Sequence, residues 1–358
     1  MKIAVLGGGH GAYAAAADLS EKGHEIRLWR RDAAAFAPVL ESRAIRVRDV
    51  DGVRNASIAT PTTDIGVAVR GAKLILVPSP ASAQSDIAKA MAPHLAAGQV
   101  VFLPPGTFGA YVMDRIARQT GSRAEVTYAE TGTLPYLARK RATGEVAITI
   151  RAKRLPTGAY PAKRAALARD VIAEAYPAIE PCEDALSAAL LNAGPIIHPP
   201  LILLNAAPLQ HFEHWDVHHE GTQPAVRAVT DALDAERIAV REALGYRPPH
   251  FPLSDHYNSD RWMYGDAHQK LVDSGDWREH IDLHQHRYMT EDVVLGLAFL
   301  DSVAQWVSRE APVTRGLLAV AGAILGRDLR HGPRTLAALS LYTRTPDQMK
   351  ELLWEGEA

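Results

Sequence analysis

Cysteine is almost absent from this chain, which has 358 residues and a single thiol at Cys182. One cysteine excludes an intramolecular disulfide and a cysteine-rich zinc site, and it fits a reducing compartment. The chain also lacks a strong charge of either sign, because its formal net charge is −2 and its pI is near 6.7. We therefore expect no general attraction to nucleic acid or to acidic membranes.

Long apolar runs are missing as well, and no stretch approaches the length of a membrane-spanning helix. The N-terminus starts with an apolar strand and a glycine turn, without the basic flank and cleavage site of a signal peptide. These two absences predict a cytoplasmic protein. With 358 residues and no internal repeat, the chain is long enough for two domains.

The first thirty residues have the order that a mononucleotide-binding βαβ unit requires: an apolar run, a glycine turn, an alanine-rich segment and a second apolar run. The turn consists of Gly7, Gly8, Gly9, His10, Gly11 and Ala12. Gly7 permits the tight turn, Gly9 lets the backbone approach a pyrophosphate, and Ala12 allows close packing of helix on strand. We predict a dinucleotide site here; the alternative is a glycine-rich turn in another α/β protein.

The residues after the second apolar run bear on which nicotinamide cofactor fits. An acidic side chain there accepts both ribose hydroxyls, whereas an arginine neutralises a 2′-phosphate. The chain has Arg30 and Arg31 first and Asp32 one step later, which favours NADP. If the two arginines are only solvated surface charges, NAD remains the alternative.

Further βα units follow the glycine turn. Residues 73–77 and 99–103 read as buried strands, and ligands of parallel sheets lie beyond the carboxyl ends of such strands. Pro78 and Gly106, which follow these two strands, are therefore expected to line the cofactor crevice.

Strand signals vanish after about residue 182, and segments with helical spacing take over, including 225–244, 291–310 and 333–341. The predicted fold is α/β, with a Rossmann dinucleotide-binding domain over residues 1–182 and an all-α substrate domain over residues 183–358. Because substrate sites form in domain crevices, catalytic groups are expected from the second half.

Histidine is concentrated in this second half. His214, His218 and His219 form one group, and His280, His284 and His286 form another beside Asp282. A zinc or iron site is one interpretation, but no H-E-x-x-H is present and no recognised signature supplies a third, carboxylate ligand. We predict no metal, and solvated or hydrogen-bonded histidines are the simpler interpretation.

His198 stands apart because an apolar run precedes it and Pro199 and Pro200 follow, which should stop any helix. A lone histidine in such surroundings is often a packed core residue. The stretch from Arg287 to Asp292, however, supplies a guanidinium and carboxylates at the start of a helix with Thr290 as N-cap. A histidine oriented by a carboxylate, with an arginine to bind a substrate carboxylate, suffices for reducing an α-keto acid derivative.

Several motifs resemble the octopine/nopaline (opine) dehydrogenase family and occur in family order over nearly the whole chain. They are the glycine turn, Pro105 to Gly109, Glu130 to Tyr136, Asn192 to Pro199, Asp234 to Arg237 and Arg287 to Asp292. The resemblance implies a Rossmann domain followed by a helical domain, with His198 and Asp292 as catalytic residues and Arg287 as the substrate-binding arginine. The family's usual proline two residues after the aspartate is Val294 here.

The resemblance implies reductive condensation of an amino acid with an α-keto acid such as pyruvate, using NAD(P)H. These small molecules are the expected partners, and a homodimer is compatible with the sequence. Reduction of a simple 2-keto acid, a non-enzymatic NADP-binding sensor, and a glycerol-3-phosphate or ketopantoate reductase are the alternatives. The glycerol-3-phosphate and ketopantoate reductase families resemble each other in using a lysine in the helical domain. In this chain only Lys270 and Lys350 follow Lys163.

Overall fold

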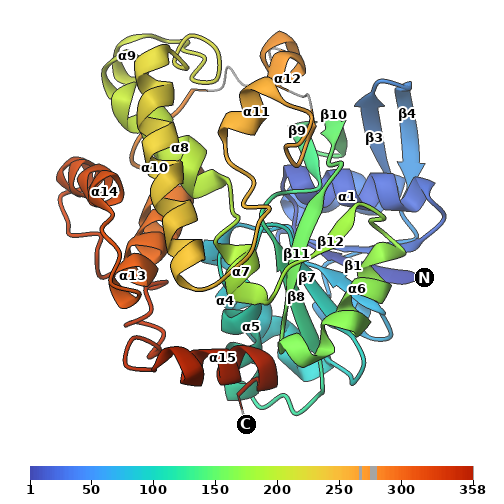
Figure 1. Ribbon diagram of the computed structural model, residues 1–358. Helices are drawn as coiled ribbons and strands as arrows, with labels where there is room; N and C mark the ends of the chain where they lie inside the picture. Colours follow the sequence, from blue (N-terminus) through green and yellow to red (C-terminus); the bar gives the residue numbers. More distant parts are fainter. Residues whose placement is uncertain (266–267, 275–279, 358) are drawn as a thin grey trace. The chain divides into compact units, whose positions relative to one another are not determined.

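The computed structural model describes residues 1–265, 268–274 and 280–357, which form two compact units (Figure 1). Unit 1 comprises residues 1–189 and 351–358, and unit 2 comprises residues 190–350. The predicted boundary after residue 182 precedes the observed one, because α7 (Ala185–Ala189) packs on β11 (Leu155–Tyr160). Gly158 makes this approach possible, since a side chain there would strike the backbone of Asp184. The end of the chain returns to unit 1 through a hydrogen bond from Glu357 N–H to Tyr160.

Unit 1 is built on an eight-stranded sheet of order β12-β11-β8-β7-β6-β1-β2-β5. The strands not yet given are β1 (Lys2–Leu6), β2 (Glu25–Trp29), β5 (Thr60–Thr62), β6 (Leu74–Leu76), β7 (Val100–Leu103), β8 (Thr127–Thr131) and β12 (Ile179–Pro181). Only β8 and β11 pair antiparallel. The apolar runs read as strands from the sequence form the buried central strands β1, β6 and β7, as two-sided burial in a parallel sheet requires.

The helices of unit 1 connect these strands as in a doubly wound fold. They are α1 (His10–Glu21), η1 (Ala34–Phe36), α2 (Ala37–Ser42), α3 (Ile65–Val69), η2 (Ala81–Ala83), α4 (Gln84–Met91), η3 (Ala92–His94), α5 (Gly109–Gln119), η4 (Ala162–Arg164), α6 (Ala165–Ala173) and α7. Asp64 begins α3 by accepting hydrogen bonds from the N–H groups of Gly66 and Val67.

A second sheet of order β4-β3-β10-β9 was not predicted. Its strands are β3 (Ala44–Asp49), β4 (Gly52–Ser57), β9 (Tyr136–Ala142) and β10 (Glu145–Arg151). Helix α1 contacts both sheets, and its run of alanines is buried, since small side chains let a sheet approach from either side (Figure 1). Arg151 ties the small sheet to α1 by binding Asp18 at 2.7 Å and Asp49 at 2.8 Å.

Unit 2 is helical. Its elements are α8 (Gly194–Leu204), α9 (Ala206–His211), α10 (Pro224–Ala243), α11 (Ser254–Asn258), α12 (His268–Ser274), the π-helix η5 (Tyr288–Leu297), α13 (Ala298–Trp306), α14 (Pro312–Leu325) and the start of α15 (Pro346–Glu355). Strands are absent from the described residues of this unit, as predicted. The predicted helices over 225–244 and 291–310 are confirmed as α10 and as η5 followed by α13.

Two local predictions for unit 2 are wrong. Helix α8 continues through Pro199 and Pro200, because its apolar side chains are buried and packing outweighs the two missing N–H donors. Residues 333–341 form turns and no helix. There the N–H of Leu336 donates to the Ser302 hydroxyl, and Ser340 has a left-handed φ of 60°.

The expectation about apolar runs also needs correction. Residues 185–204 are 20 residues long and contain an 18-residue window with a mean hydropathy of 1.4, which is enough to cross a membrane by length and composition. In the structure 83% of this window is buried within the protein. Such burial is the environment of core helices in soluble proteins.

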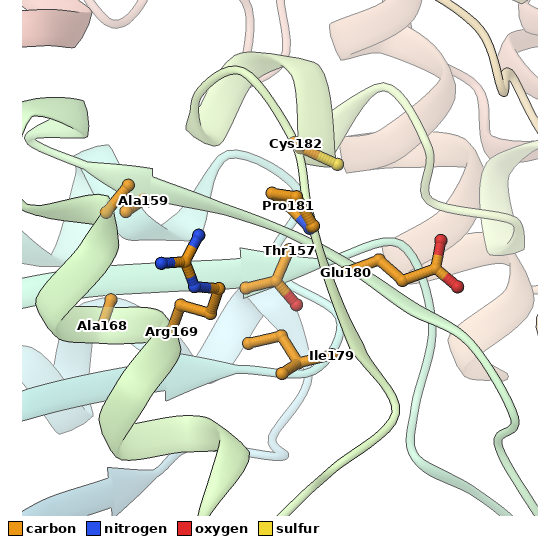
Figure 2. A pocket seen from close by; sticks show the side chains of 9 residues that line it. Thr157, Ala159, Ala168, Arg169, Ile179, Glu180, Pro181 and Cys182 are labelled. Carbon is orange, nitrogen blue, oxygen red and sulfur yellow. The ribbon is translucent and has the colours of Figure 1, made fainter.

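Cys182 lies beside a small hollow in unit 1 (Figure 2). The hollow lies between α6 and the edge strand β12, and its empty space, open solvent included, is about 300 Å³. Glu180, one of its lining residues, binds the guanidinium of Arg154 at 2.6 and 2.7 Å. The hollow lies at the sheet edge, several strands from β1 and its glycine turn.

Candidate active site

The turn after β1 has a backbone that only glycine adopts readily. Gly7 has a φ of 146°, and its N–H donates to the carbonyl of Trp29 on β2 at 3.0 Å. A side chain on Gly7 would come within 2.8 Å of the Ser79 hydroxyl, which itself donates to the carbonyl of Leu6. The turn is thereby fixed to the carboxyl ends of three neighbouring strands.

The two faces of this turn differ in the space around them. A side chain on Gly9 would meet no atom of the described residues within 4 Å, and Gly9 immediately precedes the first turn of α1. A side chain on Gly11 would instead come within 2.6 Å of Leu134. The Gly9 side is therefore open where free helix N–H groups can bind a pyrophosphate, and these residues fit a dinucleotide.

Pro78 and Gly106, the two residues expected beyond strand ends, have different surroundings. Pro78 borders the glycine turn, since its Cβ lies 3.3 Å from the position of a Gly11 side chain. Gly106 is buried against the carboxylate of Glu130, and its carbonyl accepts a hydrogen bond from Gln84 at 2.8 Å. The Glu130 carboxylate also accepts from the N–H of Ala110 in α5, so this motif packs β8 against α5.

The three charged residues after β2 have different contacts. The Arg30 side chain lies against Gly8 and donates to the carbonyl of Ala35 at 2.9 Å. Arg31 is 80% exposed and lies 3.6 Å from the carboxylate of Asp86. Asp32 accepts a hydrogen bond from the N–H of Ala35. Of the two predicted arginines, only Arg30 lies on the glycine turn.

Lys140 on β9 is a cationic residue at the turn that sequence reasoning missed. Its Nζ lies 3.5 Å from the carbonyl of Gly8, and its N–H donates to Nδ1 of His10 at 2.6 Å. The sequence signal was the unusual histidine within the glycine turn. It could not identify its partner 130 residues away, because the small sheet that brings β9 to α1 was not predicted.

In unit 2, His198 of α8 and Asp292 of η5 form a close pair. Nδ1 of His198 lies 2.7 Å from Oδ2 of Asp292. The histidine side chain is 14% exposed and the aspartate 3%. Burial raises the pKa of Asp292 to about 6, against the opposing charges of Arg287 and His286.

Two glycines allow α8 and η5 to approach. A side chain on Gly194 would come within 2.3 Å of Oδ1 of Asp292, and one on Gly296 would come within 2.2 Å of Pro195. Because the two backbones approach closely, the carboxylate of Asp292 lies within hydrogen-bond distance of the His198 ring. The π-helical backbone of η5, a form that often occurs at functional sites, carries Asp292.

Tyr288 covers the imidazole of His198. The two rings are stacked with centroids 3.6 Å apart at an interplanar angle of 12°. The Tyr288 hydroxyl lies 3.2 Å from Nε2 of His218, and His286 meets the tyrosine ring edge-on. From the sequence we predicted no role for Tyr288, although it is adjacent to Arg287 in the motif.

Arg287 contacts Glu291 one turn further along the helix, with both Nε and Nη2 at 3.2 Å from the same carboxylate oxygen. Its side chain is 45% exposed, so the guanidinium still reaches solvent. Thr290 is not the N-cap that we predicted. The helix begins at Tyr288, and the Thr290 hydroxyl donates to the carbonyl of His286.

The motif from Asp234 to Arg237 is structural. Arg237 is buried, binds Asp234 at 2.6 Å and donates to the carbonyls of Leu190, His250 and Phe251. Glu236 accepts the N–H groups of Val313 and Thr314 at the start of α14. These contacts hold α10 to the segments around it.

Metal ligands are not grouped in the part of the chain that the structure describes: no three histidine, cysteine or acidic side chains lie together as a metal site requires. Of the two predicted histidine groups, His218 and His286 contact Tyr288. His214 is 73% exposed beside Glu213.

Comparison with known proteins shows which family the chain belongs to. The family model described as NAD/NADP octopine/nopaline dehydrogenase, alpha-helical domain, matches residues 181–325. An opine dehydrogenase of Arthrobacter sp. (strain 1C) is 30% identical over 349 residues, covering 94% of each chain. The chain belongs to the opine dehydrogenase family. It is an NAD(P)-dependent oxidoreductase that acts on CH–NH bonds.

Solved structures share the fold of this opine dehydrogenase family member. A structure of octopine dehydrogenase in complex with NADH and agmatine has a TM-score of 0.70 and 18% identity, covering 96% of this chain and 99% of that one. The NADP⁺-bound yersinopine dehydrogenase has a TM-score of 0.65 and 16% identity, covering 99% and 98%. The fold therefore occurs with either nicotinamide cofactor.

The first domain is similar to that of glycerol-3-phosphate dehydrogenases. The model of the NAD-dependent glycerol-3-phosphate dehydrogenase N-terminus matches residues 2–104. In the helical unit, the side chains of Lys270 and Lys350 are exposed. Neither is enclosed by the protein as a catalytic lysine in a pocket would be.

Proposed function

We propose that this opine dehydrogenase condenses an amino acid with an α-keto acid and reduces the product. The amine and the carbonyl lose water to give an imine. Hydride then adds to the imine carbon and a proton to its nitrogen, which gives a secondary amine with two carboxylates. The observation that carries the proposal is the buried His198–Asp292 pair, with a half-exposed arginine on the same helix as the aspartate.

His198 is the acid/base group in this proposal. Its Nδ1 contacts Asp292, so Nε2 is the ring nitrogen that exchanges a proton at the reacting centre. Asp292 fixes the tautomer and stabilises the imidazolium. Tyr288 holds the ring plane by stacking on it.

Arg287 binds a substrate carboxylate. A guanidinium presents paired donors that match a carboxylate, and 45% exposure leaves this one accessible. Glu291 orients the guanidinium through its contact with Nε and Nη2. Both substrates of the proposed condensation carry a carboxylate.

The cofactor would be held by the glycine turn from Gly7 to Ala12, with Arg30 beside Gly8 and Pro78 at the border. A nicotinamide supplies the hydride when it is bound. NADP is the preferred cofactor in this proposal, because Asp32 is hydrogen-bonded to Ala35 and Arg30 lies on the turn. A cytoplasmic location and a homodimer complete the proposal.

The test is NADPH oxidation by the purified protein with pyruvate and each amino acid in turn. We expect turnover only when the keto acid and an amine are both present. Equal turnover without amine would show a simple 2-keto acid reductase. An amine-dependent product with the mass of the condensed, reduced dicarboxylate supports the proposal.

A further inference from the structure

Two cationic side chains, those of Arg30 and Lys140, lie beside Gly8 in unit 1, and they come from different sheets. The Arg30 side chain leaves the end of β2, and the Lys140 side chain leaves β9 of the small sheet. Arg30 lies so close that a side chain on Gly8 would be 2.5 Å from its Cδ, and Lys140 Nζ is 3.5 Å from the Gly8 carbonyl.

Neither cation has an acidic partner among residues 1–265, 268–274 and 280–357. Arg30 contacts the Tyr13 hydroxyl and the Ala35 carbonyl, while Lys140 contacts the Gly8 carbonyl and lies 5.5 Å from the centre of the Tyr13 ring. Burial, and then the charge of Arg30, lower the pKa of Lys140. Two cations held together without a carboxylate are stabilised when an anion binds between them.

Local structure fixes Lys140 at this place. Its N–H donates to Nδ1 of His10, so the histidine of the glycine turn anchors β9. Arg151 on the paired strand β10 binds both Asp18 of α1 and Asp49 of β3, which fixes the small sheet on the helix. The backbone of Lys140 is therefore held beside the glycine turn.

We propose that Lys140 and Arg30 together bind the 2′-phosphate of NADP, and that Lys140 is a specificity-determining residue for the cofactor. This rests on the proposed function only in its choice of NADP. The end of the second strand beside the glycine turn is where the adenosine ribose lies in dinucleotide folds. Arg31, the second arginine predicted from the sequence, is 80% exposed beside Asp86.

The test measures dissociation constants of NADPH and NADH for the full-length protein and for Lys140→Met, a side chain of similar length without charge. We expect NADPH binding to weaken by at least about tenfold and NADH binding by less than about twofold. Arg30→Met should act in the same way. Lys140→Arg should retain most of the preference, because it retains the charge.

Controls separate this proposal from its rivals. Lys153→Met removes an exposed lysine from unit 1, and it should leave both constants unchanged, as should Arg31→Met. Adenosine 2′,5′-bisphosphate and 5′-AMP serve as probes that differ only in the 2′-phosphate. If Lys140→Met weakens both probes equally, the lysine contacts another phosphate and the proposal is overturned. No effect on either probe overturns it as well.

These binding measurements need no turnover. A protein that binds NADPH through Lys140 but fails to condense an amine with a keto acid would refute the proposed reaction alone. A protein that performs the condensation with unchanged cofactor preference in Lys140→Met would refute this inference alone.

Discussion

The two units of this opine dehydrogenase use different parts of the chain for chemistry. Unit 1 offers backbone groups to a ligand. These are the N–H groups at the start of α1 and the glycine turn, where Gly7 has a φ of 146°. Unit 2 presents side chains, with His198 and Asp292 brought to 2.7 Å although they are 94 residues apart. Backbone recognition depends on residues next to each other in sequence, whereas the pair depends on two helices meeting in the correct register.

This difference implies different sensitivities. In unit 1, adding atoms to the open turn should block ligand binding and leave the fold intact. In unit 2, small changes in how α8 meets η5 should affect catalysis before they affect cofactor binding.

The largest effect on cofactor binding is expected from Gly9→Val. The residue has a φ of −87°, which any residue adopts, and the described residues leave its side-chain space empty. The variant should fold, but its branched side chain would occupy the space of the pyrophosphate, so affinity should fall by at least about 100-fold. Calorimetric titration with NADPH measures the loss, and a cooperative thermal melt checks the fold. Normal affinity would place the dinucleotide site elsewhere.

A smaller effect is expected from Gly194→Ala in unit 2. The added methyl would come within 2.3 Å of Asp292 Oδ1, so the carboxylate must shift relative to His198. Turnover should fall by about 10- to 100-fold while NADPH affinity stays unchanged. Gly316→Ala is the matched control, because a side chain at Gly316 in α14 meets no described atom within 4 Å. Equal turnover in the two variants would contradict the packing argument.

The sequence predicted unit 1 better than unit 2 for the same physical reason. The order of strand, glycine turn and helix is local, so β1, α1 and β2 could be predicted from adjacent residues. The small sheet could not, because β10 pairs with β3 about one hundred residues earlier, and a local pattern does not show which distant strand is its partner. Lys140 was missed for this reason.

In unit 2, local rules failed where tertiary contacts replaced them. Pro199 and Pro200 lie inside α8 because the helix is buried on apolar neighbours. Residues 333–341 have helical spacing, but the Ser302 hydroxyl binds the N–H of Leu336 that a helix would need. His198 and the stretch from Arg287 to Asp292 were singled out by residue type and context, and the family resemblance implied their roles. Spacing alone could not have shown that His198 and Asp292 lie in contact.

Arg287→Ala should act mainly on substrate binding. A guanidinium that holds the carboxylate before and during reaction contributes uniform binding, so the Michaelis constant should rise by about 10- to 100-fold with a smaller change in kcat. The Michaelis constant of Arg287→Lys should lie between those of the natural protein and Arg287→Ala, because lysine retains the charge but loses the paired geometry. Steady-state kinetics with keto acid and amino acid varied separately would show which carboxylate is bound. A loss confined to kcat would assign Arg287 another role.

The smallest effect concerns stability and pH. The pKa of Asp292 is raised to about 6 by burial, so the folded state binds this proton more tightly than the unfolded state does. The contribution is present at pH 4 and is lost as pH rises through 6. Relative to the natural protein, Asp292→Asn should therefore gain about 1 to 3 kcal/mol of unfolding free energy between pH 4 and pH 8. Urea unfolding at both pH values measures it, and a pH-independent difference would contradict the assignment.

The most direct measurement is a double-variant cycle on turnover with His198→Ala, Asp292→Asn and both together. If the aspartate acts through the histidine, His198→Ala should lower kcat by roughly 10²–10⁴, and the double variant should be little worse than His198→Ala alone. NADPH affinity should stay nearly unchanged throughout, because the glycine turn belongs to unit 1. If the two losses multiply, or if His198→Ala retains full activity, the pair is not the acid/base centre and His198 is a packed core histidine.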